Sequence, residues 1–203
     1  QATELVMGVP VGGAVAPTTG GLTKSGTGTL TLNAAWGNAY TGATRVNLGT
    51  LKFGAAAPVS NPLYYKYPTI TSVSGTTQTV AADALQVQSG ATFDLNGKSQ
   101  TVGTFSGGQS YPGSGGVVTN SNLSTSSDFV VVSSGTGDFS GRISGNLNLF
   151  KTGQSSLTLR DFSDYTGTTS VLNHFLILVD QARLANTSQL TVRNAVLRWD
   201  DSG

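Results

Sequence analysis

Residues capable of acid–base chemistry are few in this chain of 203 residues. His174 is the only histidine, the side chain whose ordinary pKa lies nearest to neutrality. A hydrolase with a nucleophilic serine often presents that serine in a G-x-S-x-G turn, and the sequence contains no such motif. His174 aligns with Gly49 in the internal repeat described below. We therefore expect His174 at a corner between two strands, with no catalytic role.

Carboxylates are the other candidates for catalysis. Paired acids hydrolyse glycosidic bonds, and acids clustered with Arg or Lys are typical of polysaccharide lyases. The adjacent pairs are Asp161 with Asp164 and Asp200 with Asp201. Three further acids, Asp94, Asp128 and Asp138, would form a site only if the fold stacked them together. We expect structural roles for all of these acids and predict that the chain is not an enzyme.

Metal and cofactor sites are not indicated by the sequence. The chain has no cysteine, which excludes a disulfide scaffold, a thiolate metal site and a cysteine nucleophile. Neither a G-G-x-G-x-D array nor an EF-hand loop occurs, and either would indicate calcium. We predict no metal and no cofactor.

The charge of the chain indicates no electrostatic partner. Only 10% of the residues are charged and the net charge is +1. The lysines are scattered rather than clustered, so we predict no nucleic-acid partner; they are Lys24, Lys52, Lys66, Lys98 and Lys151. The longest apolar run, residues 175–179, is too short to span a bilayer, so we predict no transmembrane segment.

An internal repeat organises the sequence that carries these residues. LTKSGTGTLTL at 22–32 and LFKTGQSSLTL at 149–159 share six of eleven residues, including Lys24 with Lys151 and Gly26 with Gly153. YTGATRVNLGTL at 40–51 then matches YTGTTSVLNHFL at 165–176. The similarity continues from 85–97 to 190–203. We therefore predict one domain, 1–203, with repeat copies at about 20–54 and 147–180.

The two copies differ by an insertion. The spacing between the second and third matched segments is about twenty residues longer in the first copy, which places the extra residues within 55–74. This insertion contains Tyr64, Tyr65, Lys66 and Tyr67. It either forms one more coil or protrudes as an aromatic loop that contacts a glycan, a receptor or a neighbouring subunit. Because adjacent side chains of a strand point to opposite sides, one of the two adjacent tyrosines would face solvent.

Alternation of apolar and small polar residues predicts short strands throughout, with glycines at the corners between them. Such strands also build sandwiches and barrels, but a solenoid is the architecture that places like residues on like in successive turns. We predict an all-β parallel solenoid of eight or nine coils, each of about 20–25 residues.

The matched segments resemble the autotransporter-associated β-strand repeat of bacterial surface proteins. The resemblance rests on L-x-K-x-G-x-G-x-L-x-L followed by Y-T-G-x-T-x-V-x-x-G-x-L, and it extends over 84–107 and 139–203. It implies a right-handed parallel β-helix, export, and display outside the cell or at the bacterial surface. It implies no activity.

The ends of a solenoid expose strand edges and core unless they are capped. The chain shows no charged cap at either end, so we expect copies to stack head to tail. The predicted function is thus a subunit of an extracellular filament or stalk. The alternative is an adhesin module that binds a glycan or a surface protein through its loops. The third hypothesis is a polysaccharide-active β-helix.

Overall fold

The chain folds as a parallel β-solenoid in a computed structural model that describes residues 4–7, 20–33, 42–54 and 84–200. These residues form strands and turns and no helix, so none of them lies in a helix long and apolar enough to cross a membrane. Every described pairing of two strands is parallel, for example β3 with β5 and β14 with β17. The predictions of an all-β fold and of parallel stacked coils are confirmed.

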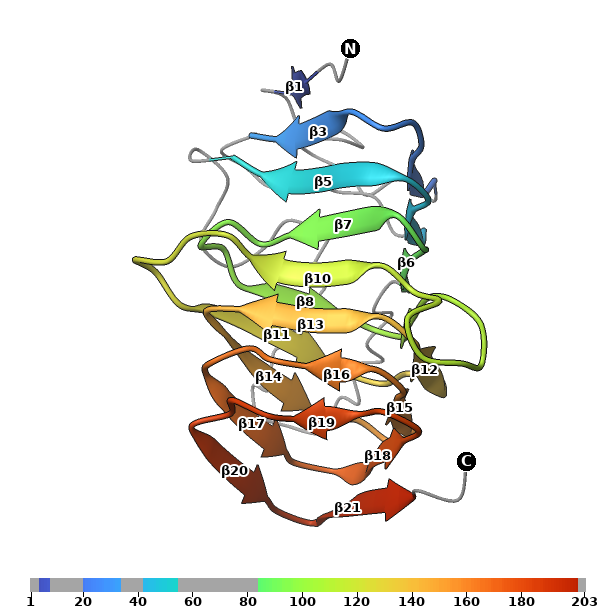
Figure 1. Cartoon of the computed structure of the whole chain (residues 1–203), viewed down its shortest axis with the longest axis vertical. Coiled ribbons are helices and arrows are strands. Elements are labelled where there is room, and N and C mark those ends of the chain that lie inside the picture. The colour runs from blue at the N-terminus through green and yellow to red at the C-terminus, as the bar shows by residue number, and fades with distance from the viewer. Residues whose placement is uncertain (1–3, 8–19, 34–41, 55–83, 201–203) are drawn as a thin grey trace, which may run out of the picture.

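The strands line three faces, which the chain visits in turn (Figure 1). The first face, at the front of the view, contains β1 (Glu4–Met7), β3 (Thr29–Leu32), β5 (Gly49–Phe53), β7 (Ala91–Asp94), β10 (Val117–Asn120), β13 (Arg142–Gly145), β16 (Phe162–Ser163) and β19 (Arg183–Leu184). The second face contains β8 (Gln100–Val102), β11 (Ser127–Val131), β14 (Leu147–Lys151), β17 (Thr168–Val171) and β20 (Gln189–Val192). The third face contains β2 (Leu22–Lys24), β4 (Thr44–Val46), β6 (Leu85–Val87), β9 (Phe105–Ser106), β12 (Gly137–Phe139), β15 (Leu157–Leu159), β18 (His174–Val179) and β21 (Ala195–Asp200).

The pairing of strands in successive coils gives the length of one coil. Glu4 pairs with Thr29 and Val117 with Arg142, each 25 residues further along the chain. Other coils are shorter, as the 21-residue steps from Thr29 to Thr50 and from Phe162 to Arg183 show. The chain returns to the first face seven times between β1 and β19, so the described part makes about seven turns.

One step of the stack is much longer than the others. Gly49 pairs with Ala91, 42 residues later. The predicted insertion at 55–74 lies within this step but outside the described residues, so its boundaries stay a prediction.

The core forms because alternate residues of every strand point inward. In β6 and β15 the pattern is buried, half-buried, buried, which is the period of a strand with one apolar face. Phenylalanines from all three faces meet on the axis: the rings of Phe93 and Phe129 lie 6.5 Å apart, and those of Phe105 and Phe129 lie 5.1 Å apart. Each fully buried ring contributes about 1.5–3 kcal/mol of transfer free energy.

The two repeat copies have equivalent structures but start on different faces. The first copy starts with β2 on the third face, and the second starts with β14 on the second face. Within each copy the contacts between coils are the same: Ala91 pairs with Gly49 as Ala195 pairs with His174. The second copy is therefore displaced by one face around the solenoid axis.

Equivalent corners of the two copies share a left-handed backbone. In the first copy glycine supplies all three positive φ angles, at Gly26 (85°), Gly49 (72°) and Gly90 (76°). In the second copy the corresponding residues are Gly153 (81°), His174 (58°) and Asn194 (49°). Only glycine adopts this conformation without a steric penalty from its own Cβ. The stack therefore imposes the left-handed backbone at this corner even where the residue is a histidine.

Candidate interaction surfaces

His174 lies at the corner between β17 and β18, where its alignment with Gly49 places it. Its ring packs edge-on against Phe175 with centroids 4.7 Å apart, and its Nδ1 lies 3.4 Å from the Ser156 hydroxyl. No described carboxylate lies in hydrogen-bond contact with it. His174 therefore lies at a corner between two strands, as its alignment with Gly49 predicts.

The described acids of the two predicted pairs form hydrogen bonds or ion pairs with neighbouring groups. Asp164 accepts two hydrogen bonds from the Arg142 guanidinium, and Asp161 accepts one from the Phe162 amide. The hydrogen bond with Asp164 raises the pKa of Arg142. Asp200 pairs with Arg198 at 2.7 Å, and Asp201 lies outside the described residues.

The three separate acids do not come together. Asp94 is on the first face, Asp128 on the second and Asp138 on the third. Asp94 is buried and accepts hydrogen bonds from the amide and hydroxyl of Ser121. Within the described part no three His, Asp or Glu side chains are grouped as a metal site would require.

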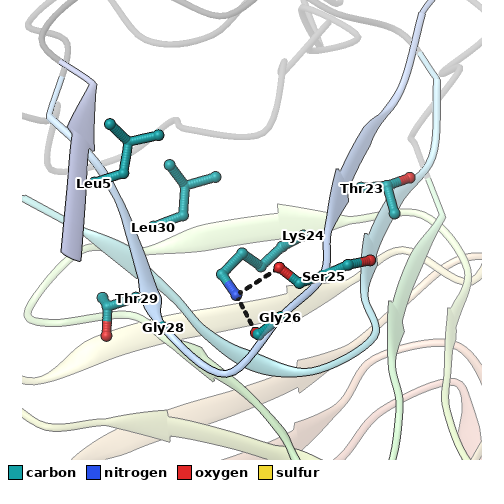
Figure 2. Close-up of a pocket in the computed structure, with 8 residues that line it drawn as sticks. All are labelled: Leu5, Thr23, Lys24, Ser25, Gly26, Gly28, Thr29 and Leu30. Carbon is teal, nitrogen blue, oxygen red and sulfur yellow. Dashed lines mark hydrogen bonds between the residues drawn. The ribbon is translucent and has the colours of Figure 1, made fainter. Parts of the chain in front are cut away.

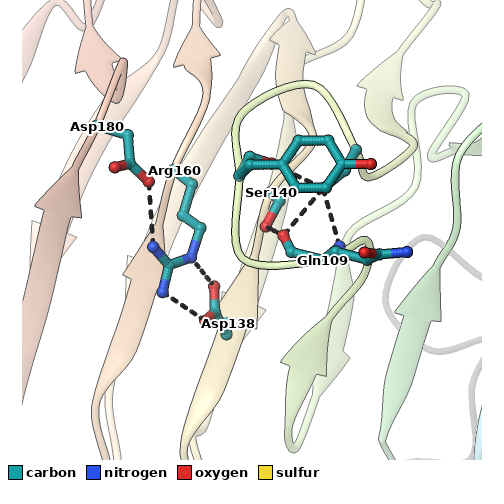
Figure 3. A network of polar contacts seen from close by, with 7 residues as sticks. Gln109, Asp138, Ser140, Arg160 and Asp180 are labelled. Atoms are coloured by element: carbon teal, nitrogen blue, oxygen red, sulfur yellow. Dashed lines mark hydrogen bonds and ion pairs between the residues drawn. The ribbon is translucent and has the colours of Figure 1, made fainter. Parts of the chain in front are cut away.

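A three-residue ion network follows the third face (Figure 3). Arg160 donates to both carboxylate oxygens of Asp138, at 2.8 and 2.9 Å, and to Asp180 of the next coil at 3.1 Å. These hydrogen bonds, that with Asp138 foremost, raise the pKa of Arg160. The network links three successive coils and leaves Asp138 nearly half exposed.

The predicted interaction loop, Tyr64, Tyr65, Lys66 and Tyr67, lies outside the described residues. A different tyrosine is placed on the surface by the loop 107–116 between β9 and β10. Tyr111 in this loop is 56% exposed. The loop extends from the side of the stack beside β12 (Figure 1).

Hydrogen bonds close this loop at its base. The Gln109 amide donates to the Ser114 hydroxyl at 2.8 Å, and the carbonyls of Gln109 and Tyr111 both lie within reach of the same hydroxyl. Ser140, on the adjacent coil, also donates to the Gln109 carbonyl (Figure 3). The loop therefore holds Tyr111 on a fixed backbone. Tyr111 is not among the residues expected from the sequence, although SGGQSYPGSGG around it is far longer than any corner of the repeat.

The core side of the last described coil is not covered by another described coil. Leu190, Val192 and Trp199 lie directly over Thr169, Val171 and Leu178, which are buried. The three residues of the last coil are 45%, 42% and 62% exposed. A hollow of about 530 Å³ opens here, lined by Phe162, Leu178, Arg183, Leu184, Ala185, Thr187, Leu190, Leu197 and Trp199.

Arg183 lies over the Trp199 ring, with its guanidinium carbon 5.3 Å from the centroid. A cation over the face of an indole is attracted by the ring quadrupole and orients the ring. This open core and the 107–116 loop are the two surfaces of the described part that offer exposed aromatic rings for contact with a partner.

Both repeat copies are similar to known proteins. Residues 22–53 and 149–173 match the family described as passenger-associated-transport-repeat. The chain is 31% identical, over 199 aligned residues, to a protein of Brucella suis biovar 1 (strain 1330) named "Adhesin BmaC autotransporter". The alignment covers 91% of this chain but 5% of that relative, so the chain spans a small part of its length. No solved structure matches the chain.

Proposed function

We propose, because both repeat copies match the passenger-associated-transport-repeat family and the chain is similar to part of an autotransporter, that it is a non-enzymatic structural segment of a bacterial surface protein. The observation that carries this proposal is that every described pairing of two strands from successive coils is parallel. Parallel strands that are hydrogen-bonded on both sides resist bending and leave few loops for proteases. A segment of this kind extends a stalk or filament outward from the cell.

The proposal includes the finer features that the family implies. We expect a right-handed winding, as parallel crossovers in one sheet almost always have. We also expect eight or nine coils over the whole chain, and the seven returns to the first face between β1 and β19 support that number.

End-to-end association of copies is part of the same proposal. A further coil in parallel register would cover the apolar side chains of Leu190, Val192 and Trp199. A coil of a second copy, added in parallel register, would bury these side chains as Thr169, Val171 and Leu178 are buried in the coil before. The unpaired edges of β20 and β21 would gain hydrogen bonds at the same time.

The test is sedimentation velocity across a concentration series, with negative-stain images of the same samples. The wild-type chain should form rods that lengthen with concentration. Trp199→Asp should abolish this growth because it places a charge in the stacked core. Val196→Asp is the matched control, since Val196 is 47% exposed on the outward side of the same strand. A monodisperse wild-type monomer would rule out stacking, and growth that survives Trp199→Asp would rule out this interface.

Adhesion is the second candidate function. The relative is named an adhesin, and the 107–116 loop presents Tyr111 on a backbone that Ser114 and Ser140 hold in place. A tyrosine ring offers an apolar face and a hydroxyl to the same ligand, a combination that suits a sugar.

A printed glycan array, probed with the wild-type chain and with Tyr111→Ala, tests this second candidate. Binding that is lost in Tyr111→Ala would support it. The double variant Tyr64→Ala plus Tyr67→Ala tests the loop that the sequence predicts, because a loss there alone would assign binding to the insertion. A wild-type chain that binds nothing on the array would count against a glycan as the ligand.

A further inference from the structure

Two lysines of the chain are buried inside the solenoid. Lys24 is 7% exposed and Lys151 is fully buried, although lysine is rarely found in a protein core unless its charge is paired. Neither forms an ion pair with a carboxylate in the described part of the chain. Both occupy the same position of the repeat, since Lys24 and Lys151 are identical in the two aligned copies. We call them the corner lysines.

Each corner lysine binds backbone carbonyls at a corner. The Lys24 amine donates to Gly26 O at 2.7 Å, Leu48 O at 2.9 Å and Ser25 O at 3.3 Å. Figure 2 shows the amine turned toward the Ser25 and Gly26 carbonyls. Two of these carbonyls belong to the lysine's own corner and one, Leu48 O, to the corner of the next coil.

Lys151 repeats this arrangement on a different face. Its amine donates to Thr152 O at 2.9 Å and to Asn173 O at 3.0 Å. Thr152 is equivalent to Ser25, and Asn173 to Leu48, in the aligned copies. An arrangement that recurs in two places with different neighbours is a feature of the repeat itself.

The corner lysines occur only at wide corners of the repeat. Four residues separate β2 from β3 and five separate β14 from β15, whereas two separate β4 from β5 and β17 from β18. A wide corner leaves more carbonyls without a partner in the strand ladder, and the three N–H donors of an ammonium satisfy them. A corner lysine therefore joins a wide corner to the tight corner that follows it.

The same inward column is apolar in the following coils. Lys24 is followed by Val46 and Val87, and Lys151 by Val171 and Val192. The neighbouring inward residues are leucine or threonine in every case, so the pattern of the core hardly distinguishes one coil from another. A slip by two residues along a strand would keep most apolar side chains inside. The lysine amine would lose its partners on the next coil.

We propose that Lys24 and Lys151 fix the register of the stack, each by admitting only the alignment in which its amine reaches the carbonyls of two successive corners. A buried ammonium without acceptors costs several kcal/mol, so a slipped alignment is strongly disfavoured. The native alignment gains little in exchange, because carbonyl hydrogen bonds only offset the desolvation of the amine. The corner lysines thus contribute specificity of stacking at the expense of stability.

The chain has no cysteine, so introduced cysteine pairs can report the register. Phe150 lies opposite Ser170 across β14 and β17, and the two side chains point outward. Phe150→Cys with Ser170→Cys reports the native register. Phe150→Cys with Thr168→Cys reports a slip of two residues. Each pair is made in the otherwise wild-type chain, with Lys151→Met, and with Val171→Met as the matched control in the same column.

Disulfide yields after refolding decide the proposal. In Lys151→Met the slipped product should rise about tenfold over the wild-type background, equivalent to about 1.4 kcal/mol of lost discrimination. Val171→Met should leave that background unchanged. Lys151→Met should also unfold at a urea concentration no lower than the wild-type chain does. A folded Lys151→Met that yields only the native product would overturn the proposal. So would a Lys151→Met that fails to fold where Val171→Met folds, since the lysine would then supply stability rather than register.

Discussion

Gly49 and His174 occupy the same corner of the repeat, with φ of 72° and 58°. Each begins the first strand after a tight corner, and each supports an alanine of the next coil, Ala91 or Ala195. At Gly49 a built Cβ would lie 2.4 Å from both Gly26 O and Gly28 O. The steric demand at one repeat position therefore depends on the carbonyls of the coil before it.

Alanine substitutions at three glycines separate these effects. At Gly20 a Cβ would meet nothing within 4 Å, so we expect Gly20→Ala to change the free energy of unfolding by less than about 0.5 kcal/mol. Gly26→Ala has room but keeps φ at 85°, which costs about 1–2 kcal/mol. Gly49→Ala adds the clash and should cost more than about 2 kcal/mol. Urea unfolding of the three variants measures this order. Equal losses at Gly26 and Gly49 would show that the coils can separate to admit a methyl group.

The stability of the chain should depend on pH in the alkaline range. Burial lowers the pKa of Lys151 to about 8 from the ordinary 10.5. The unfolded chain then binds more protons than the folded chain between these values, so the free energy of unfolding rises with pH from about 8. The rise amounts to about 1–3 kcal/mol. Lys151→Met should remove most of it in urea titrations at pH 7 and pH 9.5.

Tyr165 sets the upper limit of this rise. It is buried, its hydroxyl lies 2.5 Å from that of Thr169, and burial raises the pKa of Tyr165 above the ordinary value of 10.0. Above about pH 10 the unfolded chain loses this proton while the folded chain keeps it, so stability falls again. Tyr165→Phe should shift the fall to higher pH. A titration that stays flat from pH 7 to 11 in the wild-type chain would contradict both effects.

Much of the fold can be predicted from the sequence because the stacked coils of a solenoid are visible in the sequence as a repeat. The alignment of Gly49 with His174 and of Val87 with Val192 predicts which residues share a corner or a column, and the strand register has the same pairs. The displacement of the second copy by one face was not predicted. It depends on the number of residues between the copies and on which corners are wide. Neither property can be predicted from the similarity of the matched segments.

In the sequence Lys24 and Lys151 are two of five scattered lysines, whereas in the structure both are buried. Their identity in aligned positions of the repeat is the signal that could have singled them out, because a solvated lysine has no reason to recur at a core position. Tyr111 was missed for the opposite reason. It lies in a loop outside the repeat, where only the loop's length distinguishes it from a simple turn.

The Arg160 network should contribute more than an ordinary surface ion pair. Arg160 is 21% exposed and donates to carboxylates of two other coils. Lysine cannot reproduce this forked geometry, so Arg160→Lys should cost about 1 kcal/mol. Arg198→Lys is the control. The Arg198 side chain is 59% exposed in its ion pair with Asp200, so this substitution should cost almost nothing. Thermal unfolding at low and at high salt measures both. Equal shifts of the unfolding temperature for the two variants would show that the network acts as a set of independent surface pairs.

The 107–116 loop should open without unfolding the solenoid. The Ser114 hydroxyl contacts the Gln109 amide and carbonyl and the Tyr111 carbonyl. Ser114→Ala removes these contacts at the base of the loop, while the strands on either side keep their parallel partners. We expect cleavage within 107–116 by the broad-specificity protease proteinase K to accelerate about tenfold, with global stability reduced by no more than about 1 kcal/mol. Ser110→Ala, within the same loop, is the control. Cleavage at the wild-type rate in Ser114→Ala would mean that Ser140 and the backbone hold the loop on their own.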